Sequence, residues 1–217
     1  MITMFQLNPS LLKFPPVKLA NNEGLLAYGG DLSVARLIEA YKHGIFPWYD
    51  QSDTILWWAP DPRMVLFPDE IKISKSMRAF MRKSNYTITK NKAFKAVISH
   101  CATVRRKGQE GTWLHQDMQS AYYKLYQEGK AFSIEVWNAE NVLVGGLYVI
   151  QSNQQVWSGE SMFHLEPNTS KLAFIYLAQL AQQNAIKLID CQLYTDHLAS
   201  LGAREIPRFE FMTYFDI

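Results

Sequence analysis

The clearest pattern along the chain is the spacing of apolar residues by three and four positions, which is typical of amphipathic helices. It predicts helices over residues 74–83, around 94–101 and around 118–125. Two serines look like N-caps of further helices. Ser33 would open a helix that stops at a glycine, and Ser170 would open a long apolar helix reaching Gln183.

A second pattern is the alternation of apolar and polar residues, which predicts a strand over residues 132–137. Two apolar runs, 142–150 and 155–160, predict further strands, and a fourth follows the long helix at 186–193. The chain therefore reads strand, strand, strand, helix, strand, with additional helices before this run. This order predicts an α+β fold.

The first sixty residues differ from the rest in being rich in proline, glycine and aromatic residues. Three tryptophans fall within residues 48–58, flanked by prolines that prevent one regular element. They could form an aromatic plug against the rest of the molecule, or a wall for an apolar or base-bearing ligand. Regular patterns begin after Pro62, which predicts a small N-terminal domain, 1–62, and a larger domain, 63–217.

Composition narrows the class of protein. Hydrophobic residues make up 48% and charged residues 19%, so a packed core is expected rather than disorder. The net charge of +2 excludes a uniformly basic nucleic-acid binder, so any such contact needs a local patch. Two isolated cysteines argue against a zinc site or a disulfide scaffold. The sequence shows neither a signal peptide nor an apolar run of membrane-spanning length, so a cytoplasmic location is expected.

Acidic residues inside apolar runs are the first candidates for chemistry, because a buried carboxylate is costly unless it is used or paired. Glu160 lies in such a run, and so does Asp190. On a regular strand Asp190 and Gln192 would share one face while Cys191 points away. That face could hold an amine beside an oriented carbonyl. A purely structural role for Asp190, as a cap of a helix or turn, is an equal alternative.

The predicted helix at 74–83 carries its cations together on the face opposite its apolar residues. No acidic residue lies in this helix. The cations are Lys75, Arg78 and Arg82, with Lys83 nearby. Such a face is either ordinary solvated surface or a site for phosphates. Residues 105–107 form a second basic cluster.

Several motifs in chain order resemble one family, the bacterial leucyl/phenylalanyl-tRNA–protein transferases. They are GLLAYGGDLS (24–33), GIFPW (44–48), WWAPDPR (57–63), EGTW (110–113), GESMF (159–163), IDCQ (189–192), DH (196–197) and SLGA (200–203). The strand order is also similar to the core of the N-acetyltransferase-like (GNAT) fold. The resemblance covers nearly the whole chain and implies a GNAT-like domain behind a small N-terminal module.

The resemblance implies an aminoacyltransferase. It would take Leu, Phe or Met from aminoacyl-tRNA and join it to the N-terminal Arg or Lys of a protein, marking that protein for degradation. The aminoacyl ester is already activated, so no cofactor, acetyl-CoA, ATP or metal is expected. No membrane partner is expected either. The acceptor amine, with a reference pKa of about 8, must lose a proton. Asp190 could accept that proton or orient the amine.

The resemblance also implies roles for individual residues. Asp190, Gln192 and Glu160 would be catalytic, with Gln192 orienting the attacking group or the scissile carbonyl. Trp48 and Trp113 would stack around the 3′ adenosine. The pocket for the donated side chain would be lined by Leu147, Trp157, Phe174 and Ile189. The basic helix face would bind the tRNA backbone.

Two other functions compete with this interpretation. An acyl-CoA-dependent GNAT acyltransferase would need a phosphate-gripping glycine loop at a helix start, and residues 166–169 before the long helix offer none. A non-catalytic tRNA-binding module would leave Glu160, Asp190 and Gln192 without a task.

Overall fold

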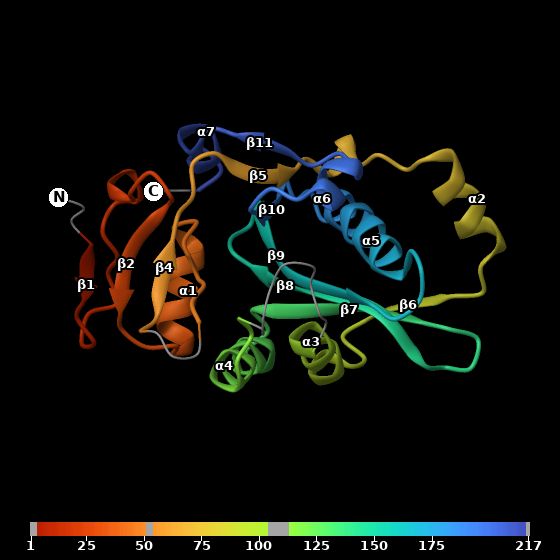
Figure 1. Cartoon of the computed structure of the whole chain (residues 1–217), viewed down its shortest axis with the longest axis horizontal. Helices are drawn as coiled ribbons and strands as arrows, with labels where there is room; N and C mark the ends of the chain where they lie inside the picture. Colours follow the sequence, from red (N-terminus) through yellow and green to blue (C-terminus); the bar gives the residue numbers. More distant parts are fainter. Residues whose placement is uncertain (1–3, 51–53, 104–112, 216–217) are drawn as a thin grey trace.

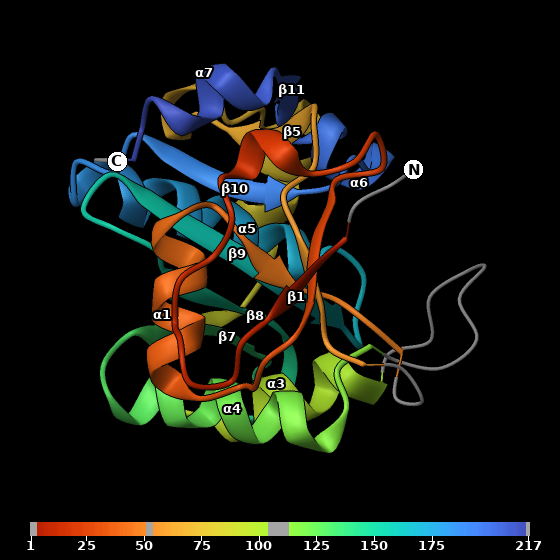
Figure 2. The ribbon, with the colours of Figure 1, turned by 90° about the vertical axis from the view of Figure 1, so that its left-hand side faces the viewer.

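The computed structural model describes residues 4–50, 54–103 and 113–215, and its described strands form two sheets. The smaller sheet belongs to the N-terminal module and has four strands in the order β1-β2-β4-β3. A helix packs beside it (Figures 1 and 2). The elements of this module are β1 (Phe5–Leu7), β2 (Leu25–Gly29), α1 (Val34–Lys42), β3 (Phe46–Pro47) and β4 (Leu56–Trp58). The tryptophan-rich segment supplies the short strand β4, which pairs with β3 just before the segment.

The larger sheet has seven strands in the order β11-β5-β10-β9-β8-β7-β6. Its strands are β5 (Arg63–Leu66), β6 (Thr87–Lys90), β7 (Ala131–Trp137), β8 (Leu143–Gln151), β9 (Val156–His164), β10 (Leu188–Gln192) and β11 (Arg204–Ile206). The helices are α2 (Lys75–Lys83), α3 (Phe94–Thr103), α4 (Gln116–Gln127), α5 (Thr169–Gln183), α6 (Asp196–Ser200) and α7 (Arg208–Met212). Short 3₁₀ turns occupy Val17–Leu19 and Pro68–Glu70.

The predicted order of strand, strand, strand, helix, strand is present as β7, β8, β9, α5 and β10, and the α+β class is confirmed. Figure 1 shows α5 on one face of the large sheet and α3 with α4 on the other. β8 is buried along nearly its whole length, because helices cover both faces. This explains why its sequence is continuously apolar instead of alternating.

The predicted cap at Ser33 is confirmed, because its side chain accepts a hydrogen bond from the Arg36 amide. Ser74, the first residue of the helix predicted over 74–83, is the N-cap of α2 and accepts from the Met77 amide. The predicted cap at Ser170 is wrong. The helix begins one residue earlier, where the Thr169 hydroxyl donates to the Val144 carbonyl at 2.8 Å and draws the first turn onto β8. Within the described residues, no helix combines the length and apolarity needed to cross a membrane.

The two sheets lie on either side of the predicted domain boundary, since β4 ends at Trp58 and β5 begins at Arg63. A single apolar cluster nevertheless crosses it and joins Leu37 and Trp57 to Phe94 and Tyr122. Figure 2 shows α4 passing beside α1 at this junction. The division at residue 62 therefore stays a prediction about domain organisation, because the module and the larger domain share a core.

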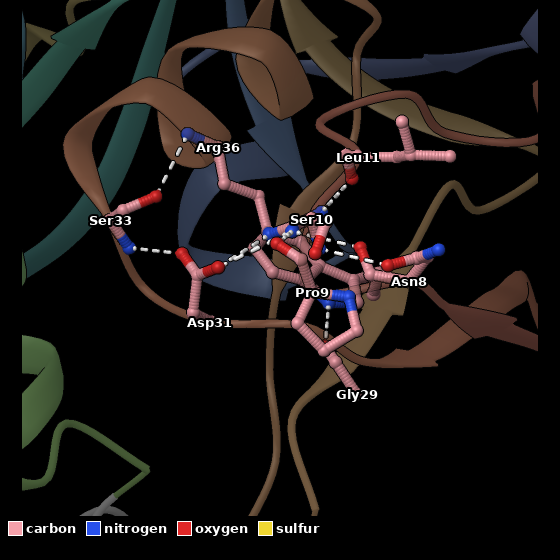
Figure 3. A network of polar contacts seen from close by, with 9 residues as sticks. Asn8, Pro9, Ser10, Leu11, Gly29, Asp31, Ser33 and Arg36 are labelled. Atoms are coloured by element: carbon pink, nitrogen blue, oxygen red, sulfur yellow. Dashed lines mark hydrogen bonds and ion pairs between the residues drawn. The ribbon is translucent and has the colours of Figure 1, made fainter.

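A buried arginine holds the start of the N-terminal module in place (Figure 3). Arg36 of α1 is fully buried, and it donates to the carbonyl oxygens of Leu11 at 3.0 Å and Pro9 at 3.1 Å. Its charge is balanced by Asp31, with Nε and Oδ2 3.3 Å apart. Because a buried guanidinium needs its donors satisfied, this contact ties the segment before β2 to the helix.

Candidate active site

Two neighbouring strands of the large sheet separate near their ends and open a cavity. β9 and β10 are parallel and remain paired as far as Ser158 and Asp190. Beyond this point each strand carries an extra residue, Glu160 in β9 and Cys191 in β10, where the register to the next strand shifts. Such bulges redirect side chains and are common beside active sites.

The cavity between the separated strands has a volume of about 440 Å³. Its walls come from β3, β8, β9, α5, the end of β10 and the start of α6, so both modules contribute. The lining residues are Phe46, Pro47, Trp48, Trp113, Leu147, Gly159, Glu160, Ser161, Met162, Phe174, Leu177, Cys191, Gln192, Leu193, Tyr194, Thr195, His197 and Leu198. Apolar walls with a few convergent polar groups are typical of a binding site for an organic ligand.

Six of the residues singled out from the sequence meet in this cavity. The two tryptophans, from opposite modules, face it together with a carboxyl group, a carboxamide and two apolar side chains. These residues are Trp48, Trp113, Glu160, Gln192, Leu147 and Phe174. Trp48 is partly exposed and its ring packs 5.6 Å from that of Trp58. The aromatic segment thus serves both as packing and as a wall of the cavity.

Trp157 and Ile189, which were predicted to line the donor pocket, are not among the residues that line this cavity, so their assignment stays a prediction. They lie opposite each other where β9 and β10 are still paired, and both are buried. The Trp157 ring packs edge-on against Phe132, with centroids 4.9 Å apart. Both residues precede the bulges at Glu160 and Cys191.

The expected alternation of Asp190, Cys191 and Gln192 is also interrupted. Cys191 is the bulged residue, and it lines the cavity with Gln192 whereas Asp190 does not. Gln192 adopts a left-handed conformation with φ of 66°. A residue other than glycine rarely takes this conformation, and such strain is found at functional sites. The bulge therefore directs the Gln192 side chain into the cavity while Asp190 stays in the core.

Asp190 is fully engaged by an arginine from β5. Its two carboxylate oxygens accept hydrogen bonds from Nε and Nη2 of Arg63, each at 2.7 Å, and both side chains are about 2% exposed or less. The Ser158 hydroxyl donates to the same carboxylate at 3.2 Å, and the backbone N–H of Gln192 donates to it at 2.9 Å. The rings of Phe46 and Phe211 lie 4.8 and 4.7 Å from the guanidinium.

This environment decides what Asp190 can do. A carboxylate that already accepts hydrogen bonds from a bidentate arginine and two further donors has little acceptor capacity left, and it is shielded from solvent. It is poorly placed to take a proton from a ligand. Its geometry suits the orienting role, because it holds the backbone of Gln192 at the bulge.

Glu160 is the polar partner of Gln192 across the cavity wall. The Gln192 Nε2 donates to Glu160 Oε1 at 2.9 Å, and the Tyr122 hydroxyl donates to Oε2 at 3.2 Å. The pKa of Glu160 is raised to about 8. Burial is the main cause and Asp190 acts in the same direction, while the hydroxyls of Tyr41 and Tyr122 and the charge of Arg63 oppose it. Glu160 therefore exchanges its proton close to neutral pH.

Comparison with known proteins assigns the chain to a family. The family model described as leucyl/phenylalanyl-tRNA protein transferase matches residues 65–216, and the family model of its N-terminal domain matches residues 30–61. The chain belongs to this transferase family. A transferase of this name from Christiangramia forsetii is 51% identical over 97% of this chain and 99% of its own. The one from Flavobacterium johnsoniae is 55% identical over 93% of this chain and 94% of its own.

Solved structures show a more distant likeness to this transferase. One is a probable acetyltransferase with a TM-score of 0.45 and 13% identity. The alignment covers 57% of this chain and 93% of the acetyltransferase. A GCN5-related N-acetyltransferase from Kribbella flavida covers 77% of the chain and 58% of its own, at a TM-score of 0.43 and 11% identity.

The basic helix of this transferase, α2, has the predicted faces. Met77 is buried and Phe80 and Met81 pack against the core. The four cations Lys75, Arg78, Arg82 and Lys83 are exposed, and no ion pair between described residues involves them. Figure 1 shows α2 at the end of the molecule far from the N-terminal sheet. The second basic cluster, 105–107, and the first residues of the EGTW motif lie outside the described residues.

Sequence reasoning missed four residues that build the site of this transferase: Arg63, Ser158, Tyr41 and Tyr122. Arg63 carried a detectable signal, because a cation at the start of an apolar strand demands a partner. The tyrosines carried none, since both were consistent with ordinary helix-core positions. Among the described residues, no group of three or more His, Cys, Asp or Glu side chains could hold a metal ion.

The raised pKa of Glu160 predicts how stability depends on pH. A carboxyl whose pKa is higher in the folded than in the unfolded state stabilises the fold fully below the unfolded value of 4.5, and that contribution is lost as pH rises toward about 8. We expect the unfolding free energy of the wild type to fall over this window relative to Glu160→Gln. The difference is on the order of 1.4 kcal/mol per pKa unit.

Urea unfolding of both proteins at several pH values measures this difference. A constant difference between the wild type and Glu160→Gln across the window would show that the pKa of Glu160 is not raised.

Proposed function

We propose that this chain transfers leucine, phenylalanine or methionine from aminoacyl-tRNA to the N-terminal Arg or Lys of acceptor proteins. The observation that carries the proposal is the cavity between β9 and β10. It joins two tryptophans, an apolar wall and the Glu160–Gln192 pair in a chain that belongs to the transferase family. The product would mark the acceptor for degradation.

The reaction is the attack of an amine on an ester. The acceptor nitrogen forms a bond to the carbonyl carbon, the bond from that carbon to the ribose oxygen breaks, and the amine proton must leave. Because the ester is already activated, positioning supplies much of the rate. No step requires energy from a nucleotide.

The described side chains fit three tasks in this reaction. Trp48 and Trp113 offer faces on which the terminal adenine can stack. Gln192 uses its amide N–H on Glu160, which leaves its carbonyl oxygen to accept a hydrogen bond from the attacking amine. Glu160 has a pKa of about 8, close to that of an N-terminal amine, and suits acceptance of the proton. Asp190 positions Gln192.

The test is an assay with labelled leucyl-tRNA and a protein that begins with arginine, without coenzyme A. Transfer of label into the protein is expected. The matched control is the same protein with an N-terminal alanine, which should stay unlabelled. Label that appears only when an acyl-CoA is the donor would favour a GNAT acyltransferase, and tRNA binding without transfer would favour a non-catalytic module.

The donor pocket should select by volume and apolarity. Phe174 and Leu147 line it, each 2% exposed. Replacing Phe174 by alanine should change the ratio of kcat/KM for phenylalanine and leucine donors by about tenfold, because apolar pockets discriminate by roughly 1–3 kcal/mol per methylene.

Donor competition measures that ratio, and Phe174→Leu serves as the conservative control that keeps the pocket filled. Equal ratios in the wild type and in Phe174→Ala would show that Phe174 does not contact the donated side chain.

The cations of α2 should bind phosphates of the tRNA. Replacing Arg78 and Arg82 by glutamate should weaken binding of different aminoacyl-tRNAs alike and reduce the slope of log K against log salt by about one to two. Transfer from a short 3′-aminoacyl-adenosine donor should be unaffected.

The control for this prediction is Lys18→Glu with Lys187→Glu, which makes the same change in net charge at exposed sites elsewhere. A salt slope equal to that of the wild type in the α2 variant would leave this helix as ordinary solvated surface.

A further inference from the structure

A chain of hydrogen bonds runs from the N-terminal module to the cavity. The Tyr41 hydroxyl of α1 lies 3.0 Å from the Tyr122 hydroxyl of α4. Tyr122 contacts Glu160 at 3.2 Å, and Glu160 contacts Gln192 at 2.9 Å. Tyr41 is 3% exposed, Tyr122 is fully buried and Glu160 is 9% exposed. Four separate elements thus meet at one carboxyl group, and one of them belongs to the N-terminal module.

This series of hydrogen bonds decides which end of the Gln192 side chain meets the ligand. An amide has a donor end and an acceptor end, and Glu160 takes the donor end. If Glu160 could rotate, the amide could turn with it and present either end to the cavity. Tyr122 contacts the other carboxyl oxygen, so both oxygens are held and rotation is opposed.

Hydroxyl groups are suited to this task because each can donate and accept. When Glu160 is ionised, Tyr122 donates to it and Tyr41 can donate to Tyr122. When Glu160 is protonated, it can donate to Tyr122 in turn. Burial, followed by the nearby Glu160, raises the pKa of both tyrosines well above the ordinary value, so both keep their protons. The other charged groups that act on Glu160 are Asp190 and Arg63, which neutralise each other.

We propose that Tyr122, held by Tyr41 of the N-terminal module, is a positioning residue for transfer, which acts by fixing Glu160 and through it the amide of Gln192. This inference rests on the proposed function and deepens it. It explains why the N-terminal module shares a core with the larger domain: its helix α1 supplies the outer end of the chain. Neither tyrosine is among the residues that line the cavity.

The test replaces each hydroxyl alone. We expect Tyr122→Phe to lower kcat for transfer by about 10- to 100-fold, the range for loss of orientation at a reacting group, with the KM for aminoacyl-tRNA unchanged. Tyr41→Phe should act in the same direction, because its hydroxyl holds that of Tyr122. The matched control is Tyr123→Phe on the same helix, whose ring packs against Phe94 and Lys95 and which should transfer at the wild-type rate.

A double-mutant cycle separates positioning from a general loss of structure. If Tyr122 acts through Glu160, then Tyr122→Phe should cause no further loss of kcat in a Glu160→Gln background. Losses that multiply would overturn the proposal, and so would a kcat for Tyr122→Phe equal to that of Tyr123→Phe. If Tyr122→Phe unfolds, the same cycle with Tyr41→Phe decides the outcome by the same criteria. Failure of the proposed function has a different signature, since the wild type itself would then transfer nothing from aminoacyl-tRNA.

Discussion

Replacing Asp190 by asparagine is expected to lower the transfer rate at least about a hundredfold and to destabilise the fold by about 3 kcal/mol. Removing one member of a buried ion pair leaves its partner charged and unpaired, which typically costs roughly 3–5 kcal/mol. Here the partner is Arg63, enclosed between Phe46 and Phe211. The loss of activity follows because asparagine places an NH2 group against a guanidinium donor, which displaces the side chain that holds the Gln192 backbone at the bulge.

Urea unfolding and single-turnover transfer measure the two effects, and tRNA binding should be preserved because the basic face of α2 is elsewhere. The control is the double variant Arg63→Gln with Asp190→Asn, which buries no net charge. It should regain part of the stability lost in Asp190→Asn and none of the transfer rate. A folded Asp190→Asn protein with a wild-type rate would refute the role of Asp190.

Replacing Gln192 by glycine is expected to abolish most transfer while leaving stability unchanged or raised. The side chain that contacts Glu160 is lost, so kcat should fall at least about a hundredfold, as for other misplaced reacting groups. The backbone gains instead, because Gln192 has φ of 66° and a left-handed conformation costs a side-chain-bearing residue about 1 kcal/mol or more. Thermal unfolding and single-turnover transfer report the two effects on one sample.

Ala185→Gly is the matched control for this variant. Ala185 also has a positive φ, of 56°, and is exposed at the end of α5, away from the cavity. This variant should gain stability and keep full activity. If Gln192→Gly kept a wild-type kcat, the carboxamide would not take part in transfer. A large loss of stability in Gln192→Gly would show that the backbone strain is smaller than the side-chain contact.

Features that depend on neighbours within a few residues were predictable from the sequence. The cap at Ser33 is made by a side chain bonding to the amide three residues on, so its signal is local. The apolar face of α2 follows from helical periodicity in the same way. The periodicity and length of the apolar runs predicted the order and type of β7, β8, β9, α5 and β10. The motifs, taken in chain order, identified the family.

Features that depend on contacts between distant parts of the chain were not predictable. The cap at Ser170 failed because Thr169 bonds to Val144 of another element. Arg63 and Asp190 are 127 positions apart, and no local pattern joins them. The pairing of Trp157 with Ile189 across β9 and β10 is likewise a long-range contact that no local pattern reveals.

Residue types and short-range spacing were enough to predict the longer helices, the strands β7 to β10 and the family, but not the short strands β1 to β6 and β11. The tertiary structure alone decided which side chains meet. It placed a bulge at Cys191 that turns Gln192 into the cavity, and it enclosed Asp190 against Arg63. A bulge shifts the side-chain alternation of a whole strand end, and its position is set by the neighbouring strands rather than by the strand itself. For this reason the roles of Asp190 and Gln192 could be separated only in three dimensions.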